Sequence, residues 1–477
     1  MIPVEISTVR HIHLVAVCGV GMGTLAGMLK EKGYRVTGSD QAIYPPMSEK
    51  LAAWGIPVLE GYKPEHLEPR PDLVVIGNAI SKGNPEGDAV LERGIPYVSM
   101  AEALRLFFFD GKILSAVCGT HGKTTSTALL SWVLENAGFD PTYLVGGVLE
   151  NTGRGYRVGG GSLAVVEGDE YDTAWFDKVP KFVRYRPDLA VLGNIEFDHA
   201  DIYADLAAVI DAFRQLVVNL PPDGLLVAGI DNPRVRDLLP LAPCAARTFG
   251  LCDDADLTGR ILDLRPAGMS FEVFADGKSR GVYRSTIVGE YNLLNILGVI
   301  GLADRLGIGD EALRAGLASF TGVKRRQQVL GEAAGVLVID DFAHHPTAVR
   351  VTLESLRAIR PNRRLVTIFE PRTNTSRRAF FQQEYAASFG AADVVILCEV
   401  QALTKGIPGD KLDVERLVAD LRIQGKEAWR ASDYPAVLDL LQKCLSPGDQ
   451  AVFLSNGGFG DLPRKTLAFL QEKDAPA

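Results

Sequence analysis

Residues 113–136 read ILSAVCGTHGKTTSTALLSWVLEN. Residues 113–117 are typical of a buried strand, and residues 124–136 of a helix that ends before Gly138. The glycine-rich turn at residues 119–125 lies between them. A turn of this kind points backbone N–H groups and a helix N-terminus at phosphate oxygens. The segment therefore predicts an α/β sheet with a phosphate-binding loop.

Two side chains of this turn suit nucleotide chemistry. Lys123 offers a mobile positive charge for phosphate, and Thr124 offers the hydroxyl that such loops give to Mg²⁺. The general spacing G-x-x-x-x-G-K-[ST] is not met, because Val117 stands where the first glycine would be. A glycine turn that only caps the helix is therefore the alternative. The residues expected to bind ATP here are Gly119, Thr120, His121, Gly122, Lys123, Thr124 and Thr125.

The pattern around this segment predicts three α/β domains. From His13 onward, short apolar runs alternate with amphipathic stretches, as in βαβ units on a parallel sheet. Alternation around Asp276 and Gly277 predicts an antiparallel hairpin, and βα alternation resumes after residue 326. We therefore expect a Rossmann-like N-terminal domain over residues 1–112, a central P-loop ATPase-like domain with an antiparallel portion over 113–324, and a C-terminal α/β domain over 325–477.

A second glycine-rich turn, residues 18–24 (CGVGMGT), also follows an apolar strand. It is similar to a dinucleotide fingerprint, but Thr24 replaces the third glycine of G-x-G-x-x-G. Ser39 and Asp40 end the next strand, where a ribose or a base is often bound. Nucleotide binding here competes with a plainer interpretation, in which the glycines only let a helix pack tightly on a strand.

Acidic and histidine-containing blocks follow three further strands. They are residues 167–172 (EGDEYD), 194–199 (NIEFDH) and 340–346 (DDFAHHP). The carboxyl ends of strands in α/β sheets gather around ligands, and Mg²⁺ prefers hard oxygen ligands. One such carboxylate of residues 167–172 beside Thr124 would therefore suffice for a magnesium site. Solvated acidic turns, a structural histidine and a helix cap are the alternatives.

The composition argues against several classes of protein. The chain has 477 residues, 47% of them hydrophobic and 23% charged, which gives enough apolar surface for folded domains throughout. Its formal net charge of −9 argues against a sequence-independent grip on nucleic acid or on an anionic membrane. Six scattered cysteines without a C-x-x-C pair, and no apolar run of bilayer length, favour a cytoplasmic enzyme with reduced thiols. We expect a monomer or weak homodimer with no nucleic-acid partner and no membrane contact.

Six blocks of the sequence, in this order, resemble those of the ATP-dependent Mur ligases, which build the peptide of bacterial cell-wall precursors. The blocks are residues 119–125, 167–172, 194–199, 289–295 (GEYNLLN), 324–326 (KRR) and 340–346. The shortened phosphate loop is the form that this family uses. The resemblance covers essentially the whole chain. It implies a three-domain α/β ligase that forms an amide bond while ATP becomes ADP and phosphate.

Further segments resemble the family members that attach a preformed tripeptide during peptidoglycan recycling. These segments are residues 44–48 (YPPMS), 77–79 (GNA), 83–85 (GNP), 176–178 (FDK), 370–375 (EPRTNT) and 455–460 (SNGGFG). The resemblance implies that UDP-N-acetylmuramate is joined to L-alanyl-γ-D-glutamyl-meso-diaminopimelate through an acyl phosphate. The alternative within the family is a ligase that adds L-alanine to the same UDP-sugar.

The resemblance also implies roles at the ATP site. Lys123 would neutralise the β and γ phosphates, Thr124 and Glu167 would hold Mg²⁺, and His199 would help to place a second Mg²⁺. Several sister ligases carry a carbamylated lysine on the helix after the histidine block. Here no lysine occurs between residues 199 and 222, and Arg214 lies near the expected place. We therefore predict no carbamylation.

Other implied roles fall on the remaining blocks. Asn292 and Asn295 would steady the adenine side, and Arg325 and Asp341 would complete the ATP site when the third domain closes. The catalytic residues implied are Lys123, His199, Arg325 and Asp341. The substrate contacts implied are Gly19, Gly21, Ser39, Asp40 and Asn78 on the UDP side, and Arg372, Asn374 and Asn456 on the acceptor side.

Two functions of a different class are open on the sequence alone. A nicotinamide-dependent dehydrogenase would use the first glycine turn and would carry out hydride transfer. A non-catalytic nucleotide-binding module would leave the ordered acidic and histidine blocks unexplained. The ligase predicts ATP-dependent phosphate release, which neither alternative predicts.

Overall fold

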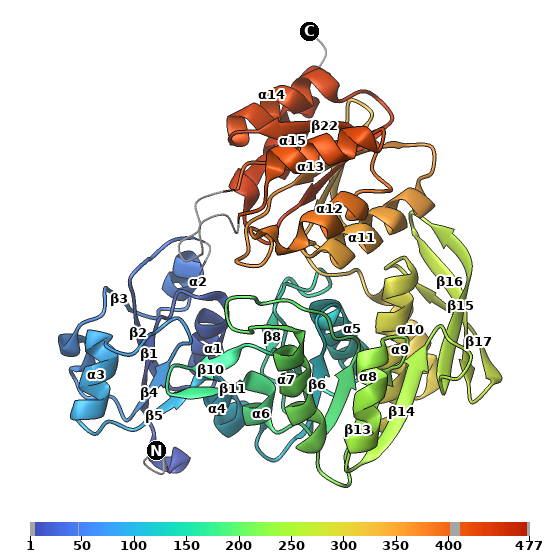
Figure 1. The fold of residues 1–477 in the computed structure, drawn as a ribbon. Helices are drawn as coiled ribbons and strands as arrows, with labels where there is room; N and C mark the ends of the chain where they lie inside the picture. Colours follow the sequence, from blue (N-terminus) through green and yellow to red (C-terminus); the bar gives the residue numbers. More distant parts are fainter. Residues whose placement is uncertain (1–4, 46, 401–410, 475–477) are drawn as a thin grey trace.

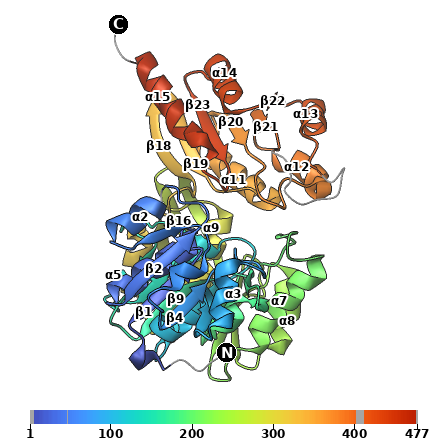
Figure 2. The same ribbon diagram turned by 90° about the vertical axis from the view of Figure 1, so that its left-hand side faces the viewer.

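The computed structural model describes residues 5–45, 47–400 and 411–474, so that Pro46 of the segment 44–48 lies outside the described residues. Three large sheets follow one another along this part of the chain, each built from one section of the sequence. In Figure 1 the blue N-terminal section and the green and yellow central section lie side by side below the orange and red C-terminal section. Figure 2, turned by 90°, also places the C-terminal section above the other two.

The N-terminal section is a parallel sheet of five strands in the order β3-β2-β1-β4-β5. The strands are β1 His11–Val15, β2 Arg35–Asp40, β3 Val58–Glu60, β4 Leu73–Ile76 and β5 Tyr97–Ser99. The helices are α1 Val20–Glu31, α2 Met47–Ala53, α3 Pro85–Glu92 and α4 Met100–Leu104, followed by a π-helical turn Arg105–Phe109. β1 ends earlier than the apolar run suggests, because Ala16 takes a left-handed φ of 68°. The turn after β1 stands where the strand order reverses, which is where sheets of this kind bind ligands.

The central section is a sheet of ten strands in the order β17-β16-β15-β14-β13-β12-β6-β9-β7-β8. Its strands are β6 Ile113–Cys118, β7 Thr142–Leu144, β8 Tyr156–Arg157, β9 Leu163–Gly168, β12 Leu189–Leu192, β13 Leu225–Gly229, β14 Ala245–Gly250, β15 Leu257–Arg265, β16 Gly268–Ala275 and β17 Lys278–Ser285. A separate hairpin pairs β10 Asp172–Ala174 with β11 Asp177–Pro180. The helices are α5 Lys123–Asn136, α6 Lys181–Tyr185, α7 Leu206–Val218, α8 Pro233–Leu238, α9 Glu290–Arg305 and α10 Asp310–Ser319.

The pairing of the central strands positions the site. β6 lies between β12 and β9 and is parallel to both, so the loops after these three strands open at one edge of the sheet. The predicted antiparallel hairpin is present as β16 and β17, at the right-hand edge of the molecule in Figure 1. β15 joins it and extends the antiparallel portion to three strands.

The C-terminal section is a sheet of six strands in the order β18-β19-β23-β20-β21-β22. Its strands are β18 Gln328–Ala333, β19 Val336–Asp341, β20 Arg364–Phe369, β21 Val394–Cys398, β22 Glu427–Ala431 and β23 Asp449–Leu454. Its helices are α11 Pro346–Ile359, α12 Gln382–Ser388, α13 Val414–Ile423, α14 Tyr434–Cys444 and α15 Leu462–Asp474. β18 is antiparallel to β19, whereas the other strands are parallel. Short 3-10 turns occur at Ile6–Thr8, Pro64–Leu67, Leu239–Leu241, Ala379–Phe381 and Phe459–Asp461.

The predicted fold class is confirmed. The three sections are α/β layers, and the central one carries the expected antiparallel portion. The boundaries after residues 112 and 324 fall between the sheets, and we keep them as a proposal for the three domains.

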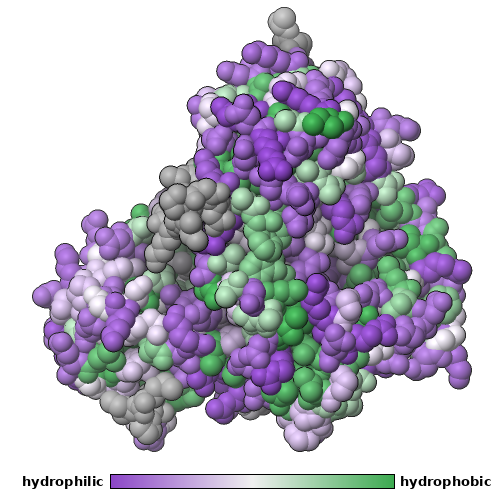
Figure 3. All heavy atoms as spheres, in the orientation of Figure 1, coloured by the Kyte–Doolittle hydropathy of each residue, from purple (hydrophilic) through white to green (hydrophobic). Residues whose placement is uncertain are grey.

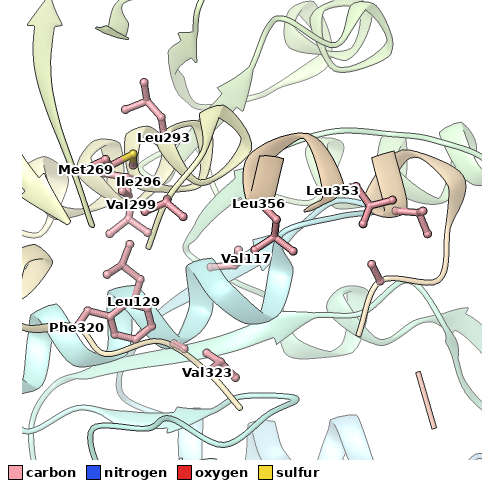
Figure 4. Packing of buried hydrophobic residues seen from close by; sticks show 14 of the residues in the cluster. Val117, Leu129, Met269, Leu293, Ile296, Val299, Phe320, Val323, Leu353 and Leu356 are labelled. Carbon is pink, nitrogen blue, oxygen red and sulfur yellow. The ribbon is translucent and has the colours of Figure 1, made fainter. Parts of the chain in front are cut away.

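One hydrophobic cluster joins the central and C-terminal sections. Figure 4 shows Val117 of β6 beside Leu356 of α11, and Leu129 of α5, Ile296 of α9 and Leu353 of α11 belong to the same cluster. All five side chains are at most 2% exposed. Burying a side chain of this size contributes about 1.5–3 kcal/mol. The shared core therefore holds α11 against the central section.

The surface and the cysteines fit the composition. Hydrophilic residues cover most of the C-terminal section on the face shown in Figure 3, and a band of hydrophobic residues lies over the central section below it. All six cysteines are free thiols. Across residues 5–45, 47–400 and 411–474, no helix combines the length and the apolar character needed to cross a membrane.

Candidate active site

The phosphate loop follows β6 and is held by the loop that follows β12. Gly119 and Gly122 take left-handed φ angles of 129° and 84°. The backbone N–H of His121 donates to Asn194 Oδ1 at 2.8 Å, and that of Thr120 donates to the Asn194 carbonyl at 3.0 Å. A Cβ on Gly119 would approach the same carbonyl to 3.0 Å. Asn194 therefore sets the shape of the loop.

Lys123 lies at the centre of this loop against a buried carboxylate. Its Nζ donates to both oxygens of Glu170, at 2.8 and 3.0 Å, and to the Gly119 carbonyl at 2.7 Å. Burial alone would lower the pKa of Lys123, but the charges of Glu170 and Asp169 outweigh burial and raise the pKa above its ordinary value. Lys123 therefore stays charged where phosphate oxygens would bind.

Glu170 also contacts the histidine of the block 194–199. His199 Nε2 lies 3.1 Å from Glu170 Oε1, and Tyr203 donates its hydroxyl to the Glu170 carbonyl at 2.6 Å. Burial lowers the pKa of His199, but the hydrogen bond with Glu170 and the neighbouring charges outweigh burial and raise it. Glu170 therefore joins two predicted catalytic residues, Lys123 and His199, in one charged group.

The two expected magnesium ligands lie side by side. Thr124 Oγ1 donates to Glu167 Oε1 at 3.0 Å, and the backbone N–H of Gly146 donates to Glu167 Oε2 at 2.8 Å. A Cβ on Gly146 would lie 2.7 Å from the same Oε2. Arg326 donates to Thr124 Oγ1 at 3.1 Å. The hydroxyl and the carboxylate thus form one cluster of hard oxygen atoms at the start of α5.

The structure brings Arg326, and not Arg325, to the phosphate loop. Arg325 has a left-handed φ of 61°, and its guanidinium lies 3.3 Å from Asp340 and donates to the Ser455 carbonyl. The guanidinium of Arg326 lies 4.3 Å from the centre of the Phe342 ring. The left-handed backbone thus turns Arg325 toward the C-terminal section, and Arg326 lies beside the phosphate loop in this arrangement.

Asp341 holds the turn that carries these arginines. It is 4% exposed and accepts the backbone N–H groups of Gln327 at 2.6 Å and Ala343 at 2.7 Å. Burial raises the pKa of Asp341. Its carboxylate therefore organises the backbone beside Arg326.

Asn292 and Asn295 lie on the first two turns of α9, next to the phosphate loop. Asn295 Nδ2 donates to Asn292 Oδ1 at 3.1 Å, and Asn292 Nδ2 donates to the Val288 carbonyl at 2.8 Å. A Cβ on Gly122 would lie 2.2 Å from Asn295 Oδ1. The loop and α9 can therefore approach this closely only because residue 122 is glycine.

His121 of the phosphate loop meets His345 of the C-terminal section across Glu196. Glu196 Oε2 lies 3.2 Å from His121 Nε2 and 3.6 Å from His345 Nδ1, and it accepts the Thr347 hydroxyl at 2.6 Å. The centroids of the two histidine rings lie 4.7 Å apart. Burial would raise the pKa of Glu196, but the hydrogen bond and charge of His121 outweigh burial and lower it to about 2. The junction of the two sections is therefore polar and ordered here.

Glu370 joins the two segments expected on the acceptor side. It accepts hydrogen bonds from the hydroxyls of Tyr434 and Ser455. Arg372 is 47% exposed and lies over Gly457, where a Cβ would come within 2.4 Å of Arg372 Cδ. The segments 370–375 and 455–460 thus form one surface beneath a half-exposed arginine.

The same surface reaches the end of the histidine block. Asn374 Nδ2 donates to Asp201 at 3.2 Å, and the backbone N–H of Ala200 donates to the Thr375 hydroxyl at 3.2 Å. Asn456 Oδ1 is buried and has no hydrogen-bond partner among the described residues. An unused acceptor therefore lies at this side of the site.

The first glycine turn serves close packing. A Cβ on Gly21 would lie 2.9 Å from the side chain of Met100, and a Cβ on Gly23 would lie 2.3 Å from that of Met47. Gly19 precedes α1 and is exposed. Tight packing therefore accounts for Gly21, whereas Gly19 borders solvent at a helix N-terminus.

Ser39 and Asp40 are buried behind this turn. Ser39 donates to Glu86 at 2.9 Å, and Asp40 Oδ2 accepts the backbone N–H of Cys18 at 2.7 Å. Asn78, which comes two residues after β4, is exposed. Among the five residues expected on the UDP side, solvent thus reaches Gly19 and Asn78 most readily.

One cleft of about 1380 Å³ brings the phosphate loop and the acceptor side together. The expected site residues that line it are Thr120, His121, Gly122, Lys123, Thr124, Thr125, Glu167, His199, Asn292, Asn295, Asp341, Arg372, Asn374 and Asn456. Those that do not line it are Gly19, Gly21, Ser39, Asp40, Asn78, Gly119 and Arg325. Arg214 pairs with Asp211 on the exposed side of α7 and is also absent from the cleft.

Four residues of the site had no role assigned from the sequence. They are Glu170, Glu196, Arg326 and His345. Each belongs to one of the quoted blocks, so a signal was present. The order of letters in a block, however, does not tell which of several acidic or basic side chains points into a cleft.

Three family models match successive sections of the chain. They are described as Mur ligase family, catalytic domain, at residues 11–108, Mur ligase middle domain at 117–303, and Mur ligase, glutamate ligase domain, at 325–457. The UDP-N-acetylmuramate–L-alanyl-γ-D-glutamyl-meso-2,6-diaminoheptandioate ligase of Escherichia coli (strain K12) is 38% identical over 469 residues, 97% of this chain and 99% of the relative. The chain belongs to the Mur ligase family. Members of this family are ATP-dependent ligases that form amide bonds.

Other Mur ligases are similar over nearly the same length. The UDP-N-acetylmuramate–L-alanine ligase of Rubrobacter xylanophilus is 36% identical and covers 95% of this chain and 98% of its own. The crystal structure of a murein peptide ligase from Psychrobacter arcticus 273-4 is 32% identical, covers 98% of this chain and all of that chain, and superposes with a TM-score of 0.71. The relative named for the tripeptide is 38% identical to this chain, and the relative named for L-alanine is 36% identical. Sequence identity therefore hardly distinguishes the two acceptors, and the acceptor has to be argued from the site.

Proposed function

We propose that this Mur ligase joins UDP-N-acetylmuramate to the tripeptide L-alanyl-γ-D-glutamyl-meso-diaminopimelate, in peptidoglycan recycling. The observation that carries the proposal is the single cleft lined both by Lys123 of the phosphate loop and by Arg372 and Asn374 of the C-terminal section. The substrates named for the Escherichia coli relative support the same reaction.

The reaction requires activation of a carboxylate, which is a poor electrophile. A carboxylate oxygen attacks the γ-phosphorus of ATP, the bond to the β–γ bridging oxygen breaks, and ADP leaves. The amine nitrogen then attacks the carbonyl carbon of the acyl phosphate and loses a proton. The bond from this carbon to the bridging oxygen breaks, and inorganic phosphate leaves with that oxygen. Both steps place negative charge on oxygen, and preorganised positive groups stabilise that charge.

We assign the phosphates of ATP to Lys123 and Arg326. Lys123 keeps its charge beside Glu170, and phosphate oxygens would replace the carboxylate as its partner. Arg326 donates to Thr124 at the same edge of the loop. His199 would then lie beside the reacting carboxylate. Arg325 would reach the phosphates only after a movement of the C-terminal section.

Mg²⁺ fits the residues present. The hydroxyl of Thr124 and the carboxylate of Glu167 are adjacent hard oxygen donors on the cleft wall, and Mg²⁺ needs few protein ligands because it keeps several waters. When bound, the ion would neutralise charge on the phosphates. Thr124 at the start of α5 and Glu167 near the end of β9 lie beside the loop where these phosphates would bind.

The acceptor side suits a peptide that carries carboxylates. Arg372 presents a planar guanidinium at the cleft, and such a group captures carboxylates in a bidentate manner. Asn456 lines the same cleft, and its unpaired Oδ1 would accept an N–H of a peptide after the buried amide turns toward the cleft. L-Alanine carries one carboxylate and would leave one of these groups unused.

A ligase for L-alanine is the second candidate. The Rubrobacter xylanophilus relative favours it, because its identity to this chain is 36%. The two candidates share the UDP-sugar and the ATP chemistry, so they differ only in the residues that bind the acceptor. Arg372, Asn374 and Asn456 are the positions that decide between them.

We place UDP at Gly19 and Asn78, supported from beneath by Asp40, with Gly21 half-buried beside them and Ser39 buried. The three domains of the proposal are residues 1–112, 113–324 and 325–477. We propose a cytoplasmic enzyme, because ATP and a UDP-sugar are its substrates. We also propose that it acts as a monomer or weak homodimer.

The test is ADP release from the purified full-length protein with ATP, Mg²⁺, UDP-N-acetylmuramate and the tripeptide, and with each substrate left out in turn. ADP release is expected only when all are present. Lys123→Ala should abolish it and leave binding of the UDP-sugar intact, because the two sites are separate. If the variant keeps more than about a tenth of the rate, a loss of less than about 1.4 kcal/mol, the assignment of Lys123 is wrong.

A further inference from the structure

We propose that His121, Glu196 and His345 form a site for a divalent transition-metal ion such as Zn²⁺, at the junction of the central and C-terminal sections. The potential ligand atoms of these three residues all lie within 4.8 Å of one another. The site is separate from the Thr124 and Glu167 pair assigned to Mg²⁺. It does not depend on which acceptor the ligase uses.

The distances around Glu196 match a metal centre. Bonds from Zn²⁺ to nitrogen and oxygen are about 2.0–2.2 Å, so two ligand atoms on a tetrahedral ion stand about 3.3–3.5 Å apart. Glu196 Oε2 lies 3.2 Å from His121 Nε2 and 3.6 Å from His345 Nδ1. Only the two histidines have to move closer, and rotation of the partly exposed His121 ring provides that movement.

The hydrogen bonds of His345 place Nδ1, the ring nitrogen without a proton, next to the carboxylate of Glu196. Its Nε2 lies 3.2 Å from the Phe197 carbonyl and can only donate to it, so Nε2 carries the proton. Its Nδ1 accepts the backbone N–H of Thr347 at 3.2 Å and therefore carries none. The one lone pair of Nδ1 is thus used by the Thr347 N–H, and Nδ1 lies 3.6 Å from Glu196 Oε2 with no proton to donate to it. A cation would take this lone pair in place of the Thr347 N–H and would bind the carboxylate at the same time.

His121 can become a ligand by moving one proton. At present Nε2 lies 3.2 Å from Glu196 Oε2 and donates to it. When a metal binds, Nε2 gives up this proton to solvent and the remaining ring proton is on Nδ1, so that the Nε2 lone pair is free to bind the ion. The site then has two nitrogen ligands and one oxygen ligand.

The ligand set selects against Mg²⁺. Two imidazoles and one carboxylate suit Zn²⁺, Co²⁺ or Ni²⁺, whereas Mg²⁺ prefers oxygen ligands and retains its waters. All three residues line the cleft, and the side chains of His121 and Glu196 are 21% and 26% exposed, so an ion can enter from solvent. Solvent can also supply the fourth ligand.

A bound ion would tie the phosphate loop to the first turn of α11. His121 belongs to the loop, Glu196 follows β12, and His345 caps α11 in the C-terminal section. The ion would therefore hold the two sections in the arrangement seen here, and its binding would stabilise the folded protein.

The test titrates Zn²⁺ into the full-length protein by calorimetry, after a chelator has been used and removed, with excess Mg²⁺ and no nucleotide. We expect one Zn²⁺ per chain at this site and a rise in the midpoint of thermal unfolding when Zn²⁺ is added. His345→Asn keeps a helix-capping oxygen for the Thr347 N–H but removes the ligand. Glu196→Gln removes the second ligand without changing the shape of the side chain.

His344→Asn is the matched control, because the adjacent histidine bonds to the Phe342 carbonyl at 3.0 Å and is not a ligand. His345→Asn and Glu196→Gln should each weaken Zn²⁺ binding by more than the roughly tenfold that loss of an outer-shell partner causes, and should remove the thermal shift. His344→Asn should keep both. The proposal would be overturned if wild type and both ligand variants bound Zn²⁺ equally. It would also be overturned if His344→Asn lost as much Zn²⁺ binding as the ligand variants, or if wild type bound no Zn²⁺. If one ligand variant does not fold, the other decides.

Discussion

Gly122 is the residue at which the phosphate loop tolerates no side chain. It has a φ of 84°, and a Cβ would lie 2.2 Å from Asn295 Oδ1. Gly111 has a similar φ of 72° but no atom within 4 Å of its Cβ position, so it separates backbone strain from the clash. We expect Gly122→Ala and Gly111→Ala each to lose about 1–2 kcal/mol of stability from the left-handed backbone.

Only Gly122→Ala should also impair ATP use, because the clash displaces Asn295 and the loop. The measurement is the KM for ATP together with the midpoint of thermal unfolding for both variants. A KM for ATP that rises in neither variant, or rises equally in both, would contradict the close approach of the loop to α9.

The pair of Gly457 and Gly458 tests the acceptor surface at the scale of one loop. A Cβ on Gly457 would lie 2.4 Å from Arg372 Cδ, whereas nothing lies within 4 Å of a Cβ on Gly458. Because a flexible side chain can move at little cost, Gly457→Ala should keep its stability and displace the guanidinium. We expect its KM for the tripeptide to rise about tenfold, equivalent to about 1.4 kcal/mol.

Gly458→Ala is the control and should keep the wild-type KM. Steady-state ADP release with varied tripeptide measures both variants. If Gly457→Ala binds the tripeptide as wild type does, Arg372 does not contact the acceptor.

The start of β1 depends on a carboxylate and therefore on pH. The backbone N–H groups of Arg10 and His11 each donate to Asp72 Oδ2 at 2.8 Å, and these bonds hold the pKa of Asp72 below its ordinary value of 3.8. A carboxyl with a depressed pKa in the folded state contributes stability above the unfolded pKa and loses it as the pH falls through the folded pKa. Asp72→Asn should therefore be less stable than wild type at pH 7, and the difference should shrink below about pH 3.8.

The midpoint of thermal unfolding of both proteins, followed from pH 7 to acid, measures this difference. A gap of constant size down to the most acidic pH would show that the charge of Asp72 does not hold the strand.

Local signals predicted the elements that their own residues determine. The strand β6, the phosphate loop and α5 follow from apolar residues, glycines and helix periodicity within one segment. The strand β18 was not predicted, because its sequence QVLGEA mixes polar and apolar residues around a glycine, and its place depends on pairing with β19. Short strands such as β7 and β8 likewise depend on neighbours that are distant in the sequence.

Across the whole molecule, the same division applies to the site. Lys123 and Thr124 were predictable because the loop is continuous in sequence. That Arg326 reaches the loop depends on the φ of Arg325, and that Glu170 binds Lys123 depends on the pairing of β6 with β9. Contacts between sections, such as Glu196 with Thr347, follow from packing that no local pattern encodes.

The choice of acceptor concerns the whole molecule, because the UDP-sugar, ATP and the acceptor engage different sections. The direct measurement is ADP release by the wild-type protein with UDP-N-acetylmuramate and either the tripeptide or L-alanine at the same concentration. We expect a clear preference for L-alanyl-γ-D-glutamyl-meso-diaminopimelate. A preference for L-alanine would contradict it and would make this protein a UDP-N-acetylmuramate–L-alanine ligase.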